Sequence, residues 1–297
     1  MAGGEVDLRN ATSLLDPADG DTRRRSIQVT AEHTGSVIDL SALVDFTDAL
    51  GTGTSDGQYS VLAARLGGTI LMGSLTDLGG VSLTHDGTGT MALAQIASFV
   101  GGEGVFSGLD VALPALTTGH DTDFIIEGVD VDFSGLTDLG YGSVLLRNGG
   151  TANLGLVTDI DGAQFFVYDG STLSLPLATS YDMASTGSYQ TRTLRAEGVG
   201  SLLDLSNLTL VTNGTHLDAD LLIQAGAGGE VDLRTATSLL DPADGDTRRR
   251  SIQVTAEHTG SVIDLSALVH FTDAFGTGTS DGQYSVLAAR LGGTILM

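Results

Sequence analysis

The sequence predicts an all-β solenoid, in which short strands wind into stacked coils. Three observations predict it: a recurring apolar pattern, a glycine at the start of most recurrences, and a long internal duplication. The pattern recurs in steps of 20 to 32 positions, the shortest from Gly108 to Gly128 and the longest from Gly3 to Gly35. Repetition of this kind is typical of architectures whose units bury their apolar faces only by stacking on their neighbours.

Each coil is predicted to begin with a short strand that has one face in the core. Counted from a start residue, positions 3 and 5 are apolar in all twelve coils, as in Val6/Leu8 and Leu203/Leu205. The residue between them points to the other face, because successive side chains of a strand alternate. The start residues are Gly3, Gly35, Gly67, Thr88, Gly108, Gly128, Gly149, Gly170, Gly200, Gly228, Gly260 and Gly292.

Two further strands are predicted in each coil. Positions 8 and 11 are also apolar, with Gly119 the exception at position 11, and these steps of three indicate a corner followed by a second strand. A third β-rich run precedes most start residues. Examples are the runs 26–30, 124–126, 143–146 and 165–168. Runs rich in Val, Ile, Phe and Tyr favour strands, and the Gly, Asp and Asn between them favour turns.

The duplication defines a superrepeat. Residues 2–72 recur as residues 227–297, and 68 of these 71 positions are identical. The copies are offset by a constant 225 positions, as from Gly3 to Gly228, so residues 2–226 form one superrepeat of nine coils and residues 227–297 begin a second. We therefore expect residues 1–297 to form a single elongated solenoid of about eleven coils. The three differences are Asn10/Thr235, Asp45/His270 and Leu50/Phe275, of which the first two are expected at the surface.

The runs Gly35–Leu43 and Gly200–Leu208 resemble repeats of bacterial surface adhesins. The pattern of the whole chain resembles right-handed parallel β-helices, which include autotransporter passengers and polysaccharide lyases. This resemblance implies a right-handed parallel β-helix. A leucine-rich-repeat solenoid is the alternative, because Leu-x-Leu-x-x-Leu also occurs there. That fold needs a buried Asn ladder and a helical return segment, whereas here position 8 is Leu, Ala, Ile or Val and the return segments are predicted as strands.

The composition excludes several classes of protein. The net charge is −24, from 37 acidic residues against 13 arginines, with no lysine. Such a surface repels nucleic acid and anionic lipid, so we expect neither as a partner. No apolar run approaches the length of a membrane-spanning helix, so no membrane insertion is expected. The absence of cysteine excludes disulfides and thiolate metal sites.

Two groups of aspartates are candidate calcium sites. Asp204, Asp232 and Asp264 occupy position 4 of successive coils, where they are expected to form an outward column about 4.8 Å apart. A bound Ca²⁺ would remove their repulsion, but a solvated acidic face screened by salt is the simpler explanation. Asp16, Asp19 and Asp21 form the second group, and residues 241–246 repeat it. Ordinary turns also explain these aspartates.

No residue is predicted to be catalytic. The clusters Arg23–Arg25 and Arg248–Arg250 adjoin the acidic loops, and the resemblance to β-helix lyases implies that an arginine beside carboxylates serves as a base. Internal Arg–Asp pairing is the simpler interpretation. A hydrolase would need neighbouring aspartates, one with a raised pKa. The pairs His85–Asp86 and His120–Asp121 stand without a recognisable nucleophile motif.

The sequence therefore predicts a structural or adhesive segment of a large, exported bacterial protein, extracellular or at the cell surface. Its expected partners are further copies of itself, end to end through open solenoid ends, and surface polysaccharide. A carbohydrate-active β-helix, either lyase or hydrolase, is the alternative, and a phage or surface fibre module is another. No cofactor other than calcium is considered.

Overall fold

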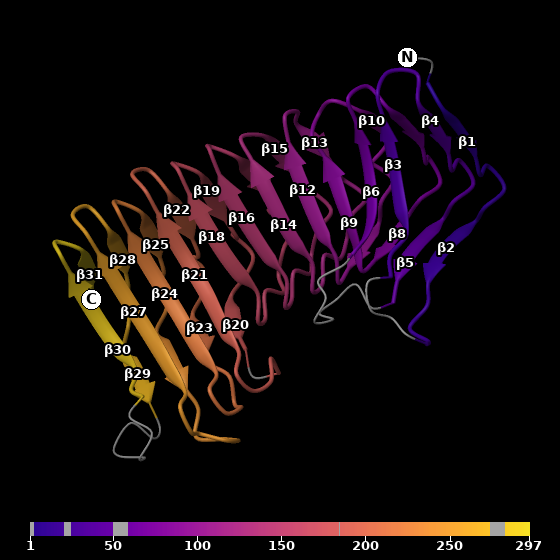
Figure 1. Cartoon of the computed structure of the whole chain (residues 1–297). Coiled ribbons are helices and arrows are strands. Elements are labelled where there is room, and N and C mark those ends of the chain that lie inside the picture. The colour runs from indigo at the N-terminus through magenta and orange to yellow at the C-terminus, as the bar shows by residue number, and fades with distance from the viewer. Residues whose placement is uncertain (1–2, 21–24, 50–58, 184, 274–282) are drawn as a thin grey trace. The chain divides into compact units, whose positions relative to one another are not determined.

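The protein is a parallel β-helix, as the coil pattern predicts. The computed structural model describes residues 3–20, 25–49, 59–183, 185–273 and 283–297. Within these residues the secondary structure consists of strands, turns and bends, and strands of successive coils pair in parallel. The chain forms two compact units, Met1–Leu136 and Thr137–Met297. Figure 1 labels the strands along the chain.

Three kinds of strand build the first unit, and we name them by their place in the coil. The start strands are β1 (Glu5–Asp7), β4 (Val37–Asp39), β7 (Thr69–Leu71), β10 (Thr90–Met91), β13 (Val111–Ala112) and β15 (Asp130–Asp132). The middle strands are β2 (Ser13–Asp16), β5 (Asp45–Asp48), β8 (Asp77–Gly79) and β11 (Ser98–Val100). The return strands are β3 (Gln28–Glu32), β6 (Ser60–Arg65), β9 (Val81–His85), β12 (Glu103–Ser107) and β14 (Asp123–Glu127).

The second unit repeats the arrangement. Its start strands are β17 (Thr151–Asn153), β19 (Thr172–Ser174), β22 (Leu202–Asp204), β25 (Glu230–Asp232), β28 (Val262–Asp264) and β31 (Thr294–Leu296). Its middle strands are β20 (Ser180–Asp182), β23 (Leu210–Thr212), β26 (Ser238–Asp241) and β29 (His270–Asp273). Its return strands are β16 (Ser143–Arg147), β18 (Gln164–Tyr168), β21 (Thr191–Glu197), β24 (Asp220–Gly226), β27 (Ser251–Glu257) and β30 (Val286–Arg290).

The register between coils follows the sequence pattern. Leu203, Val231 and Ile263, each at position 3 of its coil, are successive register partners in the start strands. The position-11 residues Val211 and Leu239 pair in the same way in the middle strands. Since the side-chain period of a strand is two, this register keeps every apolar position inside the coil. The predicted return strands are also present, which rules out the leucine-rich-repeat alternative.

One prediction fails in the short coils. Three strands were expected in every coil, yet in the coils that start at residues 108, 128 and 149 the middle strand is reduced to one bridging residue. These residues take part in the isolated bridges Ser98↔Thr118 and Asp138↔Asp159. Coil length alone does not explain the difference, because the coils that start at residues 67 and 88 are equally short and contain β8 and β11.

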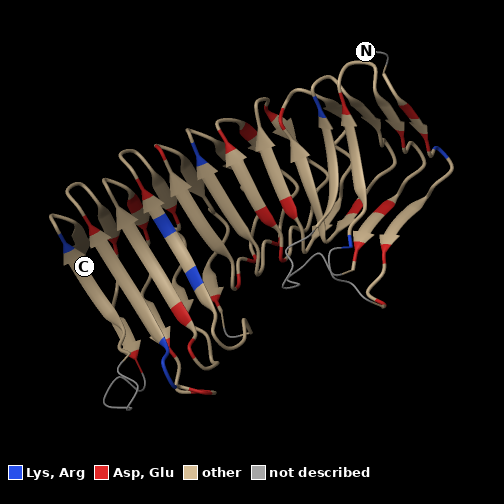
Figure 2. Ribbon diagram, viewed as in Figure 1, with Lys and Arg blue, Asp and Glu red and all other residues tan. Residues whose placement is uncertain are grey.

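The core is a column of apolar side chains inside the coils. In the second unit Leu203, Leu205, Leu208 and Val211, at the four predicted positions of one coil, are all 0% exposed. In the first unit the phenylalanines stack along the interior, and the ring centroids of Phe124 and Phe133 lie 4.8 Å apart. Figure 2 shows that most charged segments fall at strand ends and corners, which leaves the strand centres free to pack.

The corner before each start strand explains the recurrent glycine. The start residues Gly35 and Gly260 have φ values of +88° and +86°, a region that glycine enters without steric cost. His33 and His258, two positions earlier, are also left-handed, at +70° and +73°. A sharp corner of this kind turns the return strand of one coil into the start strand of the next.

Of the residues that differ between the copies, some are exposed and others are half-buried. Asn10 and His270 are exposed, whereas Asp45 and Thr235 are half-buried. The Thr235 hydroxyl donates to the Leu208 carbonyl at 2.9 Å, and the Asp45 carboxylate accepts a 2.9 Å bond from Ser13. Leu50 and Phe275 lie outside the described residues.

Candidate functional site

An acidic column runs along the start strands of the second unit. Asp204 of β22, Asp232 of β25 and Asp264 of β28 are register partners in successive coils. The structure thus brings together the three aspartates that the sequence predicts as a column. Their surroundings decide whether the column needs a bound cation.

Arg234 supplies the positive charge inside this column. It follows Asp232 by two positions, and its Nε donates bonds of 2.9 Å and 2.8 Å to the two carboxylate oxygens of Asp232. Its Nη2 also donates to Asp232 Oδ2. The Asp232 side chain is only 4% exposed, and the Arg234 charge also acts on Asp204 and Asp264. A guanidinium from the chain therefore pairs with Asp232 and offsets one of the three negative charges of the column.

Short polar side chains complete the column. The Asp204 carboxylate accepts bonds from the Ser174 hydroxyl at 2.8 Å and from the Ser206 amide at 3.1 Å. Burial acts to raise the pKa of Asp204, but the bonds from Ser206 and Ser174 and the charge of Arg234 outweigh it, so the pKa is lowered. Asp264 accepts a 2.9 Å bond from the Ser266 amide. The lowered pKa keeps the Asp204 carboxylate ionised near neutral pH.

The first copy contains the same motif in an exposed setting. Arg9 Nε lies 2.8 Å from Asp7 Oδ1 and 3.9 Å from Asp39 Oδ2, and the Asp7 side chain is 48% exposed. Hydrogen bonds from Arg9 lower the pKa of Asp7. This pairing was not predicted, although its signal is present in the sequence: an arginine follows the aspartate by two positions in both copies, close enough for the side chains to meet.

The acidic loops are closed by their own arginines. In the first copy Arg25 Nε lies 2.6 Å from Asp16 Oδ1, and Arg25 Nη1 donates to the Asp19 carbonyl at 2.8 Å. Asp19 therefore contributes its backbone oxygen to this contact. Asp21, Arg23 and Arg24 lie outside the described residues.

The second copy of the loop encloses its arginine completely. The Arg250 side chain is 0% exposed, and its Nε lies 3.3 Å from Asp241 Oδ1. Arg250 Nη1 donates to the carbonyls of Gly214 and Asp244 at 3.1 and 2.9 Å. Burial raises the pKa of Asp241 to about 6, against the opposing effects of Arg250 and of the bond from Asn213. The arginine clamps the loop from inside and is shielded from any polymer on the surface.

The remaining histidine and aspartate candidates are buried or hydrogen-bonded within the fold. His85 is buried in β9, and this burial lowers its pKa. Asp86 instead accepts bonds of 2.9 Å and 2.6 Å from the amide and hydroxyl of Thr88 in the corner. Asp159 accepts a bond from the Asp161 amide within a turn, and Asp161 accepts a 2.8 Å bond from the Asp182 amide of β20 in the next coil. Among the described residues, no group of three or more His, Asp or Glu side chains is arranged to hold a metal ion.

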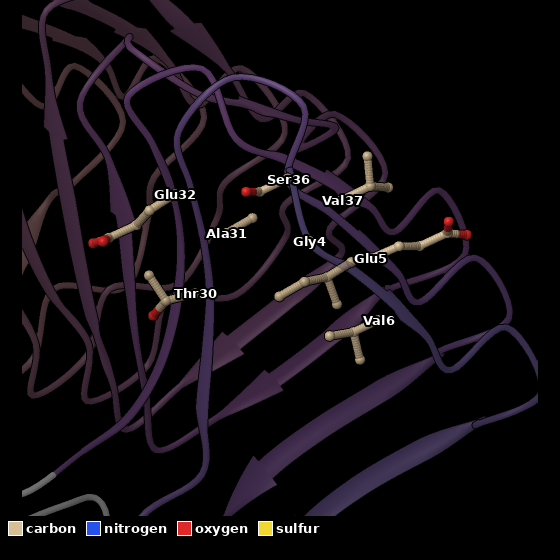
Figure 3. Close-up of a pocket in the computed structure, with 9 residues that line it drawn as sticks. Gly4, Glu5, Val6, Thr30, Ala31, Glu32, Ser36 and Val37 are labelled. Carbon is tan, nitrogen blue, oxygen red and sulfur yellow. The ribbon is translucent and has the colours of Figure 1, made fainter. Parts of the chain in front are cut away.

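The most open feature of the first unit lies between β1 and β3, in the first coil that the structure describes. A cavity of about 540 Å³ lies there, and Figure 3 shows Val6 and Ala31 among its lining side chains. Val6 and Leu8 are 48% and 42% exposed, although they occupy the core positions 3 and 5 of their coil. The sequence pattern did not predict this cavity.

A shallower depression of about 190 Å³ lies on the return strands of the second unit. Its walls include Arg195, Glu197, Gln224 and Glu257 of β21, β24 and β27. Arg195 forms an ion pair with Glu197, and its guanidinium lies 5.8 Å from the centre of the Tyr168 ring. The charged side chains of β21 on this surface are thus engaged with each other.

Comparison with known proteins identifies no relative of this chain. No protein-family model, no curated protein and no solved structure matches the chain. In the described residues, no helix has the length and apolar character needed to cross a membrane.

Proposed function

We propose that the chain is a structural segment of a large repetitive protein at the cell surface or outside the cell, where it serves as a stalk, an adhesin or a filament. One observation carries the proposal. Inside the second unit, the beginning of the second superrepeat stacks in register on the end of the first: β25 pairs with β22, β26 with β23 and β27 with β24.

The junction between the superrepeats has the same core burial and the same backbone hydrogen bonding between coils as the rest of the second unit. Val231, Leu233 and Ala236, the first core residues of the second copy, are 0% exposed. Across the junction the Glu230 amide donates to the Ser201 carbonyl at 2.9 Å, and the Leu205 amide donates to the Asp232 carbonyl at 3.0 Å. The end of a superrepeat therefore accepts the start of the next without a gap, which is what an extensible array requires.

The setting outside the cell is supported by the resemblance of the runs Gly35–Leu43 and Gly200–Leu208 to adhesin repeats. An acidic exterior also fits a segment that projects into solvent, since a net charge of −24 opposes unspecific association. Surface polysaccharide and further copies of the chain are the proposed partners. We propose this role without bound calcium, because Arg234 pairs with Asp232 and serine groups donate to Asp204 and Asp264 in the acidic column.

A carbohydrate-active enzyme receives less support. The lyase interpretation needs an arginine that reaches the substrate, whereas Arg250 is enclosed by Asp241 and three backbone carbonyls. The other two arginines of this cluster are exposed but engaged: Arg248 pairs with Asp246, and Arg249 lies 3.3 Å from Asp218. Arg25, the copy of Arg250, is paired with Asp16. A phage or surface fibre module would share the structural role and would differ only in the particle that carries it.

The test is to lengthen the chain by whole superrepeats. Chains with one, two and three added copies of the superrepeat are compared by small-angle X-ray scattering. We expect the maximum dimension to grow by roughly 43 Å per copy, since nine coils rise about 4.8 Å each. Growth well below this value, or copies that scatter as separately tethered bodies, would contradict the proposal.

The control is the enzyme assay. The same chains are incubated with a panel of acidic polysaccharides, and released sugar is measured with and without calcium. We expect no release. Turnover that the double variant Arg25→Met and Arg250→Met abolishes without loss of fold would favour the lyase alternative.

A further inference from the structure

The depression on the return strands of the second unit is built around a strand residue without a side chain. Where these strands end, Glu197 of β21, Gly226 of β24 and Glu257 of β27 are successive register partners. The row continues with Tyr168, the partner of Glu197, and with Arg290, the partner of Glu257. Gly226 is therefore a gap in a row of long polar side chains, and the depression of about 190 Å³ lies at this gap.

Neither the backbone nor the packing requires glycine at this position. The φ of Gly226 is not left-handed, unlike that of Gly228 in the corner that follows. A Cβ atom on Gly226 would lie 3.5 Å from Glu197 Cγ, which is an ordinary van der Waals contact with a flexible side chain. Glycine weakens a strand, and there it often marks a place where a ligand approaches the backbone closely. What Gly226 provides is therefore open space on the outer face of the sheet.

The side chains around the gap carry a net negative charge. The Arg195 guanidinium is paired with the Glu197 carboxylate, so these two charges balance each other. With histidine counted as neutral, the carboxylate of Glu257 leaves one negative charge in the lining, and Arg290 on its other side does not take part in that lining. A cation above Gly226 would be about 4.8 Å along the row from each glutamate position. The polar side chains of the lining are Arg195, Glu197, Gln224, Thr255, Glu257 and His258.

The shape and the charge of the gap favour a linear ammonium group. The gap is one residue wide, which suits the unbranched stem of a lysine side chain with its compact charge and three donors. A sugar ring would pack best on an open aromatic face, and the Tyr168 ring has the Arg195 guanidinium 5.8 Å from its centre. An anion would need a free Arg195, which is paired with Glu197. This sequence contains no lysine, so the ammonium group has to come from another molecule.

We propose that the gap at Gly226 is a binding site for a lysine side chain of a basic partner polypeptide. The ammonium group takes the place of the missing side chain in the row, where it donates to the carboxylates of Glu197 and Glu257 and to the Thr255 hydroxyl. The site itself does not depend on the proposed structural function. Because β21 and β24 end the first superrepeat and β27 begins the second, an array would present the site once per superrepeat, about every 43 Å, and only this spacing rests on that function.

The first test fills the gap from within the chain. Gly226→Lys places an ammonium group in the row, and Gly226→Met places a stem without a charge there. We expect the Gly226→Lys chain to melt about 2 °C above the Gly226→Met chain at low ionic strength, and the difference to vanish near 1 M salt because salt screens exposed ion pairs. Gln253→Lys and Gln253→Met are the matched controls. Their register partners are Leu222 and Val286, so the lysine should have no advantage there.

The second test measures the binding of a separate ammonium group. The full chain, labelled with ¹⁵N, is titrated with pentalysine and with the same peptide acetylated on every side-chain amine. We expect the amide resonances of Gly226 and Thr255 to shift with pentalysine only, and Gly226→Lys to abolish the shifts. Glu257→Gln should weaken binding by at least about threefold, whereas Glu230→Gln, the same loss of charge on the start strand β25, should leave it nearly unchanged.

Several results would overturn the site. Equal melting temperatures of the two Gly226 variants at low salt would do so, as would a lysine advantage of the same size at Gln253. Shifts spread over the whole acidic surface, or equal weakening by Glu257→Gln and Glu230→Gln, would mean unspecific attraction. Shifts at Gly226 with a glucosamine tetramer and none with pentalysine would refute a polypeptide partner in favour of an amino-polysaccharide. All these measurements use a chain of one length, so the lengthening experiment reports on the structural function separately.

Discussion

Gly229→Ala compared with Gly4→Ala isolates the energetics of stacking one coil on another. The two glycines occupy the same position of the duplicated sequence, and residues 5–9 are identical to residues 230–234. Only their surroundings differ. A Cβ atom on Gly229 would lie 2.5 Å from the oxygen and 2.6 Å from the carbonyl carbon of Ala196, and 2.8 Å from the Glu197 nitrogen. At Gly4 nothing lies within 4 Å.

The magnitude follows from these contacts. All three neighbours of the added carbon are backbone atoms, so the corner must shift, and overpacking of this kind costs about 1–3 kcal/mol. Alanine restricts the unfolded chain and returns about 0.4–1 kcal/mol. We therefore expect Gly229→Ala to destabilise by roughly 1–2 kcal/mol and Gly4→Ala to be neutral or stabilising by up to about 1 kcal/mol.

The assay is urea denaturation monitored by far-UV circular dichroism. The denaturant concentrations at the unfolding midpoint are compared between variants whose unfolding free energy has the same dependence on urea. A change of midpoint without a change of slope reports on stability alone. Equal effects at the two glycines would refute the reasoning, because composition and local sequence are the same and only the stacked coil distinguishes them.

Four further predictions concern equivalent residues of the two copies, a buried aspartate and the acidic column. Leu233→Ala should cost about 2–5 kcal/mol because Leu233 is 0% exposed, and Leu8→Ala less than half of that because Leu8 is 42% exposed; urea midpoints would show this, and equal costs would contradict the assigned burial. Arg234→Met should lower the melting temperature more than Arg9→Met, since Asp232 is 4% exposed and Asp7 is 48% exposed; the reverse order would argue against Arg234 as the countercharge of the column. The raised pKa of Asp241, about 6, means that its protonated form favours folding, so its contribution is fully present below the unfolded pKa near 3.8 and is lost as pH rises through 6. Between pH 4 and pH 7.5 the wild type should therefore lose up to about 3 kcal/mol relative to Asp241→Asn, and parallel pH profiles would count against it. Chelation should leave the melting temperature unchanged, because Arg234 and serine groups already contact the carboxylates of the column; a fall on chelation that calcium reverses would support the metal-site hypothesis.

Most of the fold could be predicted from residue spacing, because a strand has only two faces. Once positions 3 and 5 are apolar, one register alone keeps them inside, and Leu203, Val231 and Ile263 follow it. The acidic column was predictable for the same reason. The ion pair of Arg234 with Asp232 was not predicted, because the backbone spacing leaves the rotamer of Arg234 open.

The sequence by itself determined the coil, the spacing of the coils and the point at which the superrepeat starts again, Gly228 corresponding to Gly3. These features depend on side-chain alternation and on the glycines at the corners. It also determined that the copies are chemically equivalent. Only the tertiary structure decided that they are physically different. Val6 and Val231, Gly4 and Gly229, and Arg25 and Arg250 differ in their surroundings because a side chain's environment depends on the coil stacked above it. The stacked coil is distant in sequence, so the residues around a given position do not indicate whether that coil is present.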